Sequence, residues 1–134
     1  MIKQLKTVLM IFFAIVFLSC KKDSVATDPL VGEWELTAEI NGLTGIRTSY
    51  ETGKGNVTKF TKTTYERTRD GKSIHSGTYS ITTYQSLLTK KKETQIVYDG
   101  KANETKNYFT IDTNTLTISV DAYDGPSTIY TKIR

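Results

Sequence analysis

The sequence predicts an all-β domain, and three observations carry that prediction. Threonine occurs 23 times in the 134 residues, whereas proline occurs only twice, and such a composition suits strands. From Gly32 onward apolar and polar residues alternate, and no window has the spacing of an amphipathic helix. Four Asx-Gly pairs, which favour tight β-turns because both residues tolerate positive φ, divide this part of the chain: Asn41-Gly42, Asp70-Gly71, Asp99-Gly100 and Asp124-Gly125.

The turns and the alternation together place the strands. The first, from Trp34 to Ile40, alternates cleanly and is expected to be half-buried. The predicted strands cover residues 34–40, 46–51, 56–62, 64–69, 73–84, 94–98, 106–111, 115–122 and 128–133. Sequential strands joined by tight turns favour an antiparallel up-and-down meander of about eight strands, and its closure into a small barrel removes two open edges. A β-sandwich is the alternative on the same pattern.

The inward side chains of such a barrel form a packed core or line a ligand cavity. A barrel of about eight strands allows both arrangements, and alternation does not distinguish them. The residues expected to face inward are Trp34, Phe60, Tyr79, Ile81, Phe109 and Leu116. The eight tyrosines, all between positions 50 and 130, are interpreted mainly as cross-strand packing. Sugar or peptide binding by exposed tyrosines is the alternative.

The N-terminus predicts an export signal over residues 1–19. Lys3 and Lys6 precede an unbroken apolar run from Val8 to Leu18. Eleven helical residues would span only about 16 Å, roughly half the hydrocarbon core of a bilayer, so the run suits a secretory signal better than a transmembrane helix. Without residues 1–19, 16 basic and 14 acidic residues remain, a net charge of +2. This small surplus argues against nucleic-acid binding.

The only cysteine, Cys20, follows the signal directly. The segment Phe17-Leu18-Ser19-Cys20 resembles the lipobox of bacterial lipoproteins, in which the signal is cut before a cysteine that carries acyl chains. The resemblance implies lipidation of Cys20 and anchoring in the bacterial cell envelope. Lys21 stands where an aspartate often retains lipoproteins in the inner membrane, which favours the outer membrane. The alternative is that Cys20 is a buried thiol after an ordinary signal peptide.

A polar tether over residues 20–31 is expected to lead into a barrel domain over residues 32–134. Gly32-Glu33-Trp34 resembles the Gly-x-Trp signature that opens the lipocalin barrel. Further pieces similar to small lipocalin-like domains of bacterial lipoproteins are Phe60-Thr61, Gly77 to Ile81, Leu116 to Ile118 and Tyr130 to Ile133. Together they are spread over nearly all of the predicted domain. The resemblance implies a barrel whose floor is closed by the Trp34 ring.

Candidates for catalysis are few. His75 is the only histidine and is interpreted as a solvated strand residue, while Glu33, Glu35 and Glu39 are expected on the outer face of the first strand. We expect no catalytic residue, metal or cofactor. The function that follows is a lipid-anchored, non-enzymatic, monomeric lipocalin-like envelope protein that holds a small apolar ligand. The alternative is a protein-interaction or inhibitor module that uses its outer face or loops.

Overall fold

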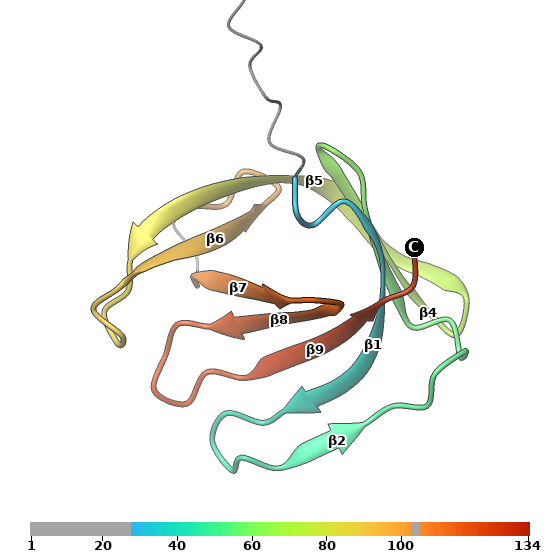
Figure 1. Ribbon diagram of the computed structural model, residues 1–134, viewed down its shortest axis with the longest axis horizontal. Helices are drawn as coiled ribbons and strands as arrows, with labels where there is room; N and C mark the ends of the chain where they lie inside the picture. Colours follow the sequence, from blue (N-terminus) through green and yellow to red (C-terminus); the bar gives the residue numbers. More distant parts are fainter. Residues whose placement is uncertain (1–27, 103–104) are drawn as a thin grey trace, which may run out of the picture.

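The computed structural model describes residues 28–102 and 105–134, and these form nine strands and no helix (Figure 1). The all-β prediction is therefore confirmed. The strands are β1 (Gly32–Ile40), β2 (Arg47–Ser49), β3 (Val57–Phe60), β4 (Thr64–Arg69), β5 (Lys72–Gln85), β6 (Lys92–Tyr98), β7 (Asn107–Asp112), β8 (Thr115–Val120) and β9 (Ser127–Lys132).

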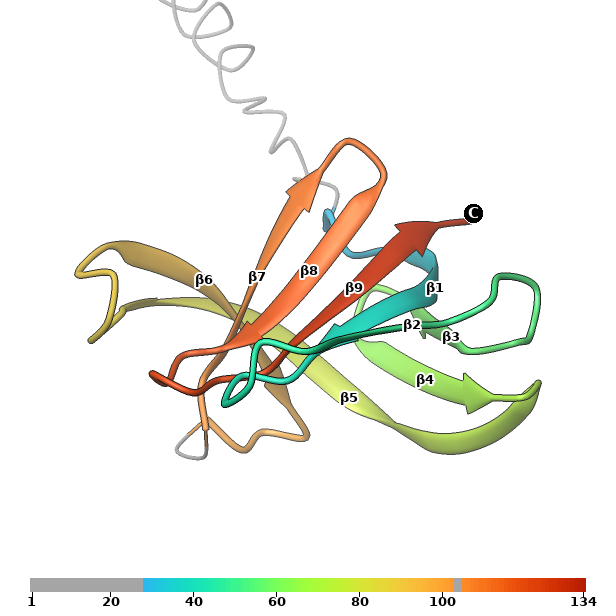
Figure 2. The same ribbon diagram turned by 90° about the horizontal axis from the view of Figure 1, so that it is seen from below.

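Eight of these strands close into a barrel. The order β1-β3-β4-β5-β6-β7-β8-β9 is completed by pairing of β9 with β1, and every pair is antiparallel. Figures 1 and 2 show the sheet curving round so that β9 lies beside β1. The predicted up-and-down, lipocalin-like barrel is confirmed, and the alternative of a β-sandwich is excluded.

The ninth strand, β2, is an addition to the barrel wall. One edge of β1 pairs with β3 through Gly32 to Glu35 and with β2 through Ala38 to Ile40. The other edge of β1 pairs with β9, and this ladder contains an irregularity between Leu36 and Ala38. Such a bulge changes which of the following side chains face inward.

The barrel is packed solid at the end where the described chain begins. Trp34 is fully buried and its indole Nε1 donates a hydrogen bond to the carbonyl oxygen of Leu30 (2.7 Å). The Lys132 ammonium lies 5.1 Å from the centroid of the Trp34 ring, within the range of a cation–π contact. Phe60 and Tyr79 meet edge to face, with their ring centroids 5.1 Å apart. These contacts close one end of the barrel.

The last four residues of the expected tether belong to this packed end. Leu30 is fully buried, and the Asp28 carboxylate accepts hydrogen bonds from the Tyr79 hydroxyl (2.5 Å) and the Leu30 amide (2.9 Å). Asp28 and Leu30 therefore pack against the barrel, whose first strand begins at Gly32. The predicted signal over residues 1–19 and the predicted lipidation site, Cys20, lie outside the described residues. Within the part that is described, no helix is long and apolar enough to cross a membrane.

Two of the four Asx-Gly pairs adopt the expected turn conformation. Positive φ occurs at Asp70 and Gly71 (49° and 72°) and at Asp99 and Gly100 (51° and 71°). The expectation is wrong for the other two pairs, whose glycines have no positive φ. A Cβ on Gly42 would lie 2.0 Å from the Asp124 carbonyl oxygen. Glycine is required there because the β1–β2 and β8–β9 connections approach each other closely, not because the backbone is left-handed.

The Asp70-Gly71 turn can be tested by substitution. Gly71→Ala should lower the free energy of unfolding by about 1–2 kcal/mol, because a Cβ strains a left-handed residue. Open space surrounds the position, with no atom within 4 Å of the point where a Cβ would lie, so crowding adds nothing. The matched control is Gly71→Asn, since asparagine visits this conformation more readily. Equal losses for both variants in urea denaturation would contradict this explanation.

Candidate functional site

The residues expected to face inward occupy the packed part of the barrel. Trp34, Phe60, Tyr79, Phe109 and Leu116 belong to one buried cluster, and the partly buried Ile81 packs against it. None of these six residues lines the hollows that surround Arg67. The structure thus places them in the core and puts a different set of side chains around the free space.

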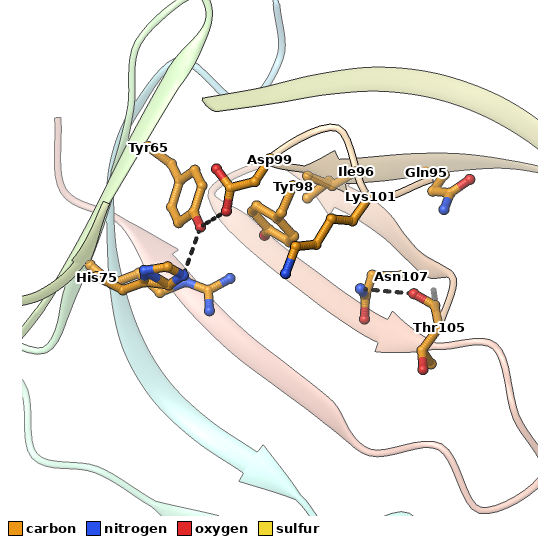
Figure 3. Close-up of a pocket in the computed structure, with 10 residues that line it drawn as sticks. Tyr65, His75, Gln95, Ile96, Tyr98, Asp99, Lys101, Thr105 and Asn107 are labelled. Atoms are coloured by element: carbon orange, nitrogen blue, oxygen red, sulfur yellow. Dashed lines mark hydrogen bonds between the residues drawn. The ribbon is translucent and has the colours of Figure 1, made fainter. Parts of the chain in front are cut away.

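Arg67 on β4 lines three adjoining hollows, of about 190, 260 and 180 Å³. We call them the first, second and third hollow, and together the Arg67 site. The walls of the first hollow include Tyr65, His75 and Asn107, which Figure 3 shows on opposite sides of the space. The second has an apolar wall made by Ile118, Val120 and Pro126. The barrel is therefore packed at one end and partly hollow around this arginine.

Arg67 faces the interior because of its place on β4. Alternate residues of a strand share a face, and Tyr65, two positions earlier, is buried in the core. Arg67 also pairs directly with Thr58 on β3 and His75 on β5. We did not predict Arg67 from the sequence, because charged residues are normally assigned to the outer face. The one indication in the sequence was the spacing of two residues from Tyr65, which puts both side chains on the same face of the strand.

Aromatic rings hold the guanidinium of Arg67. Its central carbon lies 4.9 Å from the Tyr98 ring centroid and 5.4 Å from that of Tyr65. None of the ion pairs found among the described residues includes Arg67. Its Nε and the Tyr98 hydroxyl are both buried without a hydrogen-bond partner. Burial acts to lower the pKa of Arg67, but the tyrosine neighbours, Tyr98 and Tyr130 foremost, outweigh it and the pKa is raised, so the group stays cationic.

A hydrogen-bonded cluster of Tyr65, His75 and Asp99 lines the first hollow (Figure 3). The Tyr65 hydroxyl donates to Asp99 Oδ2 (3.0 Å) and lies 3.1 Å from His75 Nε2. The other carboxylate oxygen of Asp99 accepts from the Thr78 amide (2.9 Å). Burial, and then the Asp99 hydrogen bond, raise the pKa of Tyr65. Tyr65 is therefore a hydrogen-bond donor at neutral pH and is unsuited to act as a base.

His75 is exposed, as expected for a solvated strand residue, but it also contacts this cluster. Its ring meets the Tyr65 ring edge to face at 5.5 Å. Across residues 28–102 and 105–134, no group of three or more histidine, cysteine, aspartate or glutamate side chains is placed to hold a metal ion. The chemistry that the cluster offers is hydrogen bonding.

The expected position of Glu39 is wrong. Strict alternation from Trp34 assigns it to the outer face of β1 with Glu33 and Glu35. The irregularity between Leu36 and Ala38 shifts the alternation by one residue. Glu39 consequently lines the third hollow together with Leu36, and its carboxylate accepts a hydrogen bond from the Tyr50 hydroxyl (2.7 Å).

The first hollow lies beside the least paired seam of the barrel. β6 and β7 pair only through Gln95 with Tyr108 and Ile96 with Asn107, whereas the adjoining β5–β6 ladder has seven residue pairs. Gln95, Ile96 and Asn107 also line the first hollow. A short ladder opens at a lower free energy than a long one, so we expect this seam to be the least stable part of the barrel wall.

Replacing Arg67 should stabilise the protein. Arg67→Met removes a partly buried cation that has no anionic partner among the described residues and keeps an apolar chain of similar reach. The variant loses the cation–π contacts, which destabilises it, but no longer has to desolvate a charge, which stabilises it. We expect the second effect to be larger, so that the free energy of unfolding rises by about 1 kcal/mol. The control is Arg47→Met on the exposed strand β2, which should have little effect. A clear loss of stability in Arg67→Met would show that this arginine is a structural element.

Comparisons with protein-family models, with curated proteins and with solved structures find no match for this chain. A function for it is therefore inferred from the barrel itself.

Proposed function

We propose that this chain is a lipid-anchored, non-enzymatic binding protein of the bacterial cell envelope, whose lipocalin-like barrel holds a small ligand. The observation that carries the proposal is the uneven filling of the barrel. One end is closed by fully buried Leu30, Trp34 and Phe60, while the hollows around Arg67 remain free. Ligand sites are concave and combine apolar walls with a few polar groups, and the Arg67 site has both.

The proposed anchor is the acylated Cys20. Asp28, which packs against the barrel through Tyr79, follows Cys20 by eight positions, and a fully extended chain of this length would reach about 26 Å. Two or three acyl chains, at about 0.8 kcal/mol per buried methylene, hold a protein durably on a membrane. Such a tether keeps the barrel within a few tens of ångströms of the bilayer, with the outer membrane favoured over the inner by Lys21.

Metabolic labelling with a palmitate analogue tests the anchor. Label should be incorporated into the wild-type chain and lost in Cys20→Ser, with the protein moving from the membrane fraction to the soluble fraction. Ser19→Ala keeps a small residue before the cysteine and serves as the control. Label retained in the Cys20→Ser protein would contradict the assignment.

Native mass spectrometry tests the barrel. Protein purified from envelope extract should carry an additional mass that is released on denaturation. The purified chain should also bind an apolar fluorescent probe such as anilinonaphthalene sulfonate in the folded state, with displacement by the released molecule. A bare polypeptide mass together with no probe binding would count against a ligand-holding barrel.

The second candidate function is a protein-interaction or inhibitor module, and one observation favours it. The β1–β2, β5–β6 and β8–β9 connections lie at the same end of the barrel in both views (Figures 1 and 2). They expose large apolar side chains: Leu43 (80%), Ile46 (63%), Leu87 (78%) and Tyr123 (98%). Clustered exposed apolar residues often mark interaction sites. If this candidate is right, crosslinking in cells should capture one reproducible protein, and Leu87→Ser with Tyr123→Ser should abolish the capture.

A further inference from the structure

We propose that the Arg67 site binds the carboxylate of a small amphiphilic acid, with the acid's apolar part in the second hollow. This inference rests on the proposed ligand-binding function and names the ligand's chemical class. It also refines the expectation of a purely apolar ligand.

The charge of the site favours an anion. Arg67 is a cation inside the barrel without an ion-pair partner among the described residues, and the Tyr98 and Tyr65 rings steady its guanidinium without neutralising it. A partly desolvated charge is costly unless an opposite charge compensates it. A bound anion would supply that compensation.

Two buried groups of the site can donate hydrogen bonds to a ligand. The Arg67 Nε–H and the Tyr98 hydroxyl are buried and unpartnered, and buried polar groups of this kind are uncommon without a ligand or water to satisfy them. A planar guanidinium matches a carboxylate, which accepts two parallel hydrogen bonds from it. A carboxylate placed here can satisfy the guanidinium edge and the phenol together.

The acidic side chains of the site are already occupied. Asp99 accepts from the Tyr65 hydroxyl and the Thr78 amide. Glu39, in the third hollow, accepts from the Tyr50 hydroxyl. Among the described residues neither carboxylate forms an ion pair with Arg67, so the guanidinium is left available to an anionic ligand.

The second hollow limits the size of the acid. Ile118, Val120 and Pro126 form its apolar wall, and Arg67 with Tyr98 forms its polar wall. Its volume of about 260 Å³ is below the roughly 300–1,000 Å³ that is usual for drug-sized ligands. A short acyl chain or a small ring attached to a carboxylate fits this description.

The matched probes are hexanoate and hexanamide, which have nearly the same size and shape but differ in charge. Binding is measured by isothermal titration calorimetry on the full chain in phosphatidylcholine nanodiscs, with empty nanodiscs as the blank. Hexanoate should bind more tightly than hexanamide. Arg67→Met should weaken hexanoate binding by about 10- to 100-fold, the worth of hydrogen bonds to a charged group, and leave hexanamide binding nearly unchanged.

Two further variants keep the test decisive. Tyr98→Phe removes only the unpartnered hydroxyl and should weaken hexanoate binding severalfold, whether or not Arg67→Met folds. Arg47→Met removes an exposed cation from β2 and should leave hexanoate binding intact. Equal binding of both probes, or unchanged hexanoate binding in Arg67→Met and Tyr98→Phe, would overturn the carboxylate site while the ligand-holding barrel stands. Failure of wild type to bind either probe, or any extracted ligand, would count against both proposals.

Discussion

Trp34→Ala should lower the free energy of unfolding by about 3–5 kcal/mol, the range for truncating a large buried aromatic side chain. Trp34 is fully buried and packs within the cluster that closes one end of the barrel. The substitution also leaves the Leu30 carbonyl without its donor and removes the ring beneath the Lys132 ammonium. Because small domains are stable by only about 5–15 kcal/mol, such a loss would leave much of the protein unfolded near physiological temperature.

Guanidinium denaturation followed by far-ultraviolet circular dichroism measures this effect, since the variant has no tryptophan fluorescence. Trp34→Phe is the matched control. It retains a buried ring but loses the hydrogen bond to Leu30, so it should cost clearly less than Trp34→Ala. A loss below about 1 kcal/mol for Trp34→Ala, typical of surface positions rather than of the core, would contradict a packed barrel end.

Alternation and turn chemistry predict much of this barrel because both act locally. The strand predicted over residues 64–69 coincides with β4, and the other strands differ from their predicted bounds by a few residues at most. Asp70-Gly71 adopts the expected left-handed turn. Gly42 shows where local reasoning stops. Glycine is required at position 42 because the Asp124 backbone, more than 80 positions away in the chain, lies against it. Only the closed barrel brings the two together.

The candidate site was harder to predict than the fold, for a physical reason. Hydrophobic patterning assigns arginine and glutamate to solvent, yet Arg67 and Glu39 both line the interior. Glu39 is turned inward by a bulge, which alternation alone does not reveal. Arg67 lies two positions from Tyr65 and so shares its inward face, but its charge would normally assign it to the outer face. Because polar side chains in the interior depart from the apolar pattern, patterning recovers the packed end of the barrel and misses the hollow one.

Alkaline pH should unfold this protein between about pH 10 and 12, because buried tyrosines resist ionisation. Burial raises the pKa of Tyr98 to about 12, although the neighbouring Arg67 acts in the opposite direction. Burial and the Asp28 and Asp121 carboxylates raise the pKa values of Tyr79 and Tyr84 as well. Each folded-state pKa lies above the ordinary tyrosine value of 10.0, so the unfolded chain loses these protons first. The stabilisation is therefore complete below pH 10 and is lost as the pH rises towards the folded-state values.

The contribution of Tyr98 can be isolated by substitution. A difference of about two pKa units corresponds to roughly 2–3 kcal/mol, and this part of the pH dependence should disappear in Tyr98→Phe. Tyr123→Phe is the control, because Tyr123 is 98% exposed and its loss should leave the slope unchanged. Urea denaturation at a series of pH values measures the pH dependence of the free energy of unfolding. Tyrosinate absorbance, followed in parallel, measures the ionisation of the tyrosines. If Tyr98→Phe and wild type lose stability with the same slope from pH 10 to 12, the Tyr98 ring is in contact with solvent and the first and second hollows are wider than their volumes indicate. If instead the slope falls only in Tyr98→Phe, the unpartnered phenol beside Arg67 is buried in solution, as the carboxylate site requires.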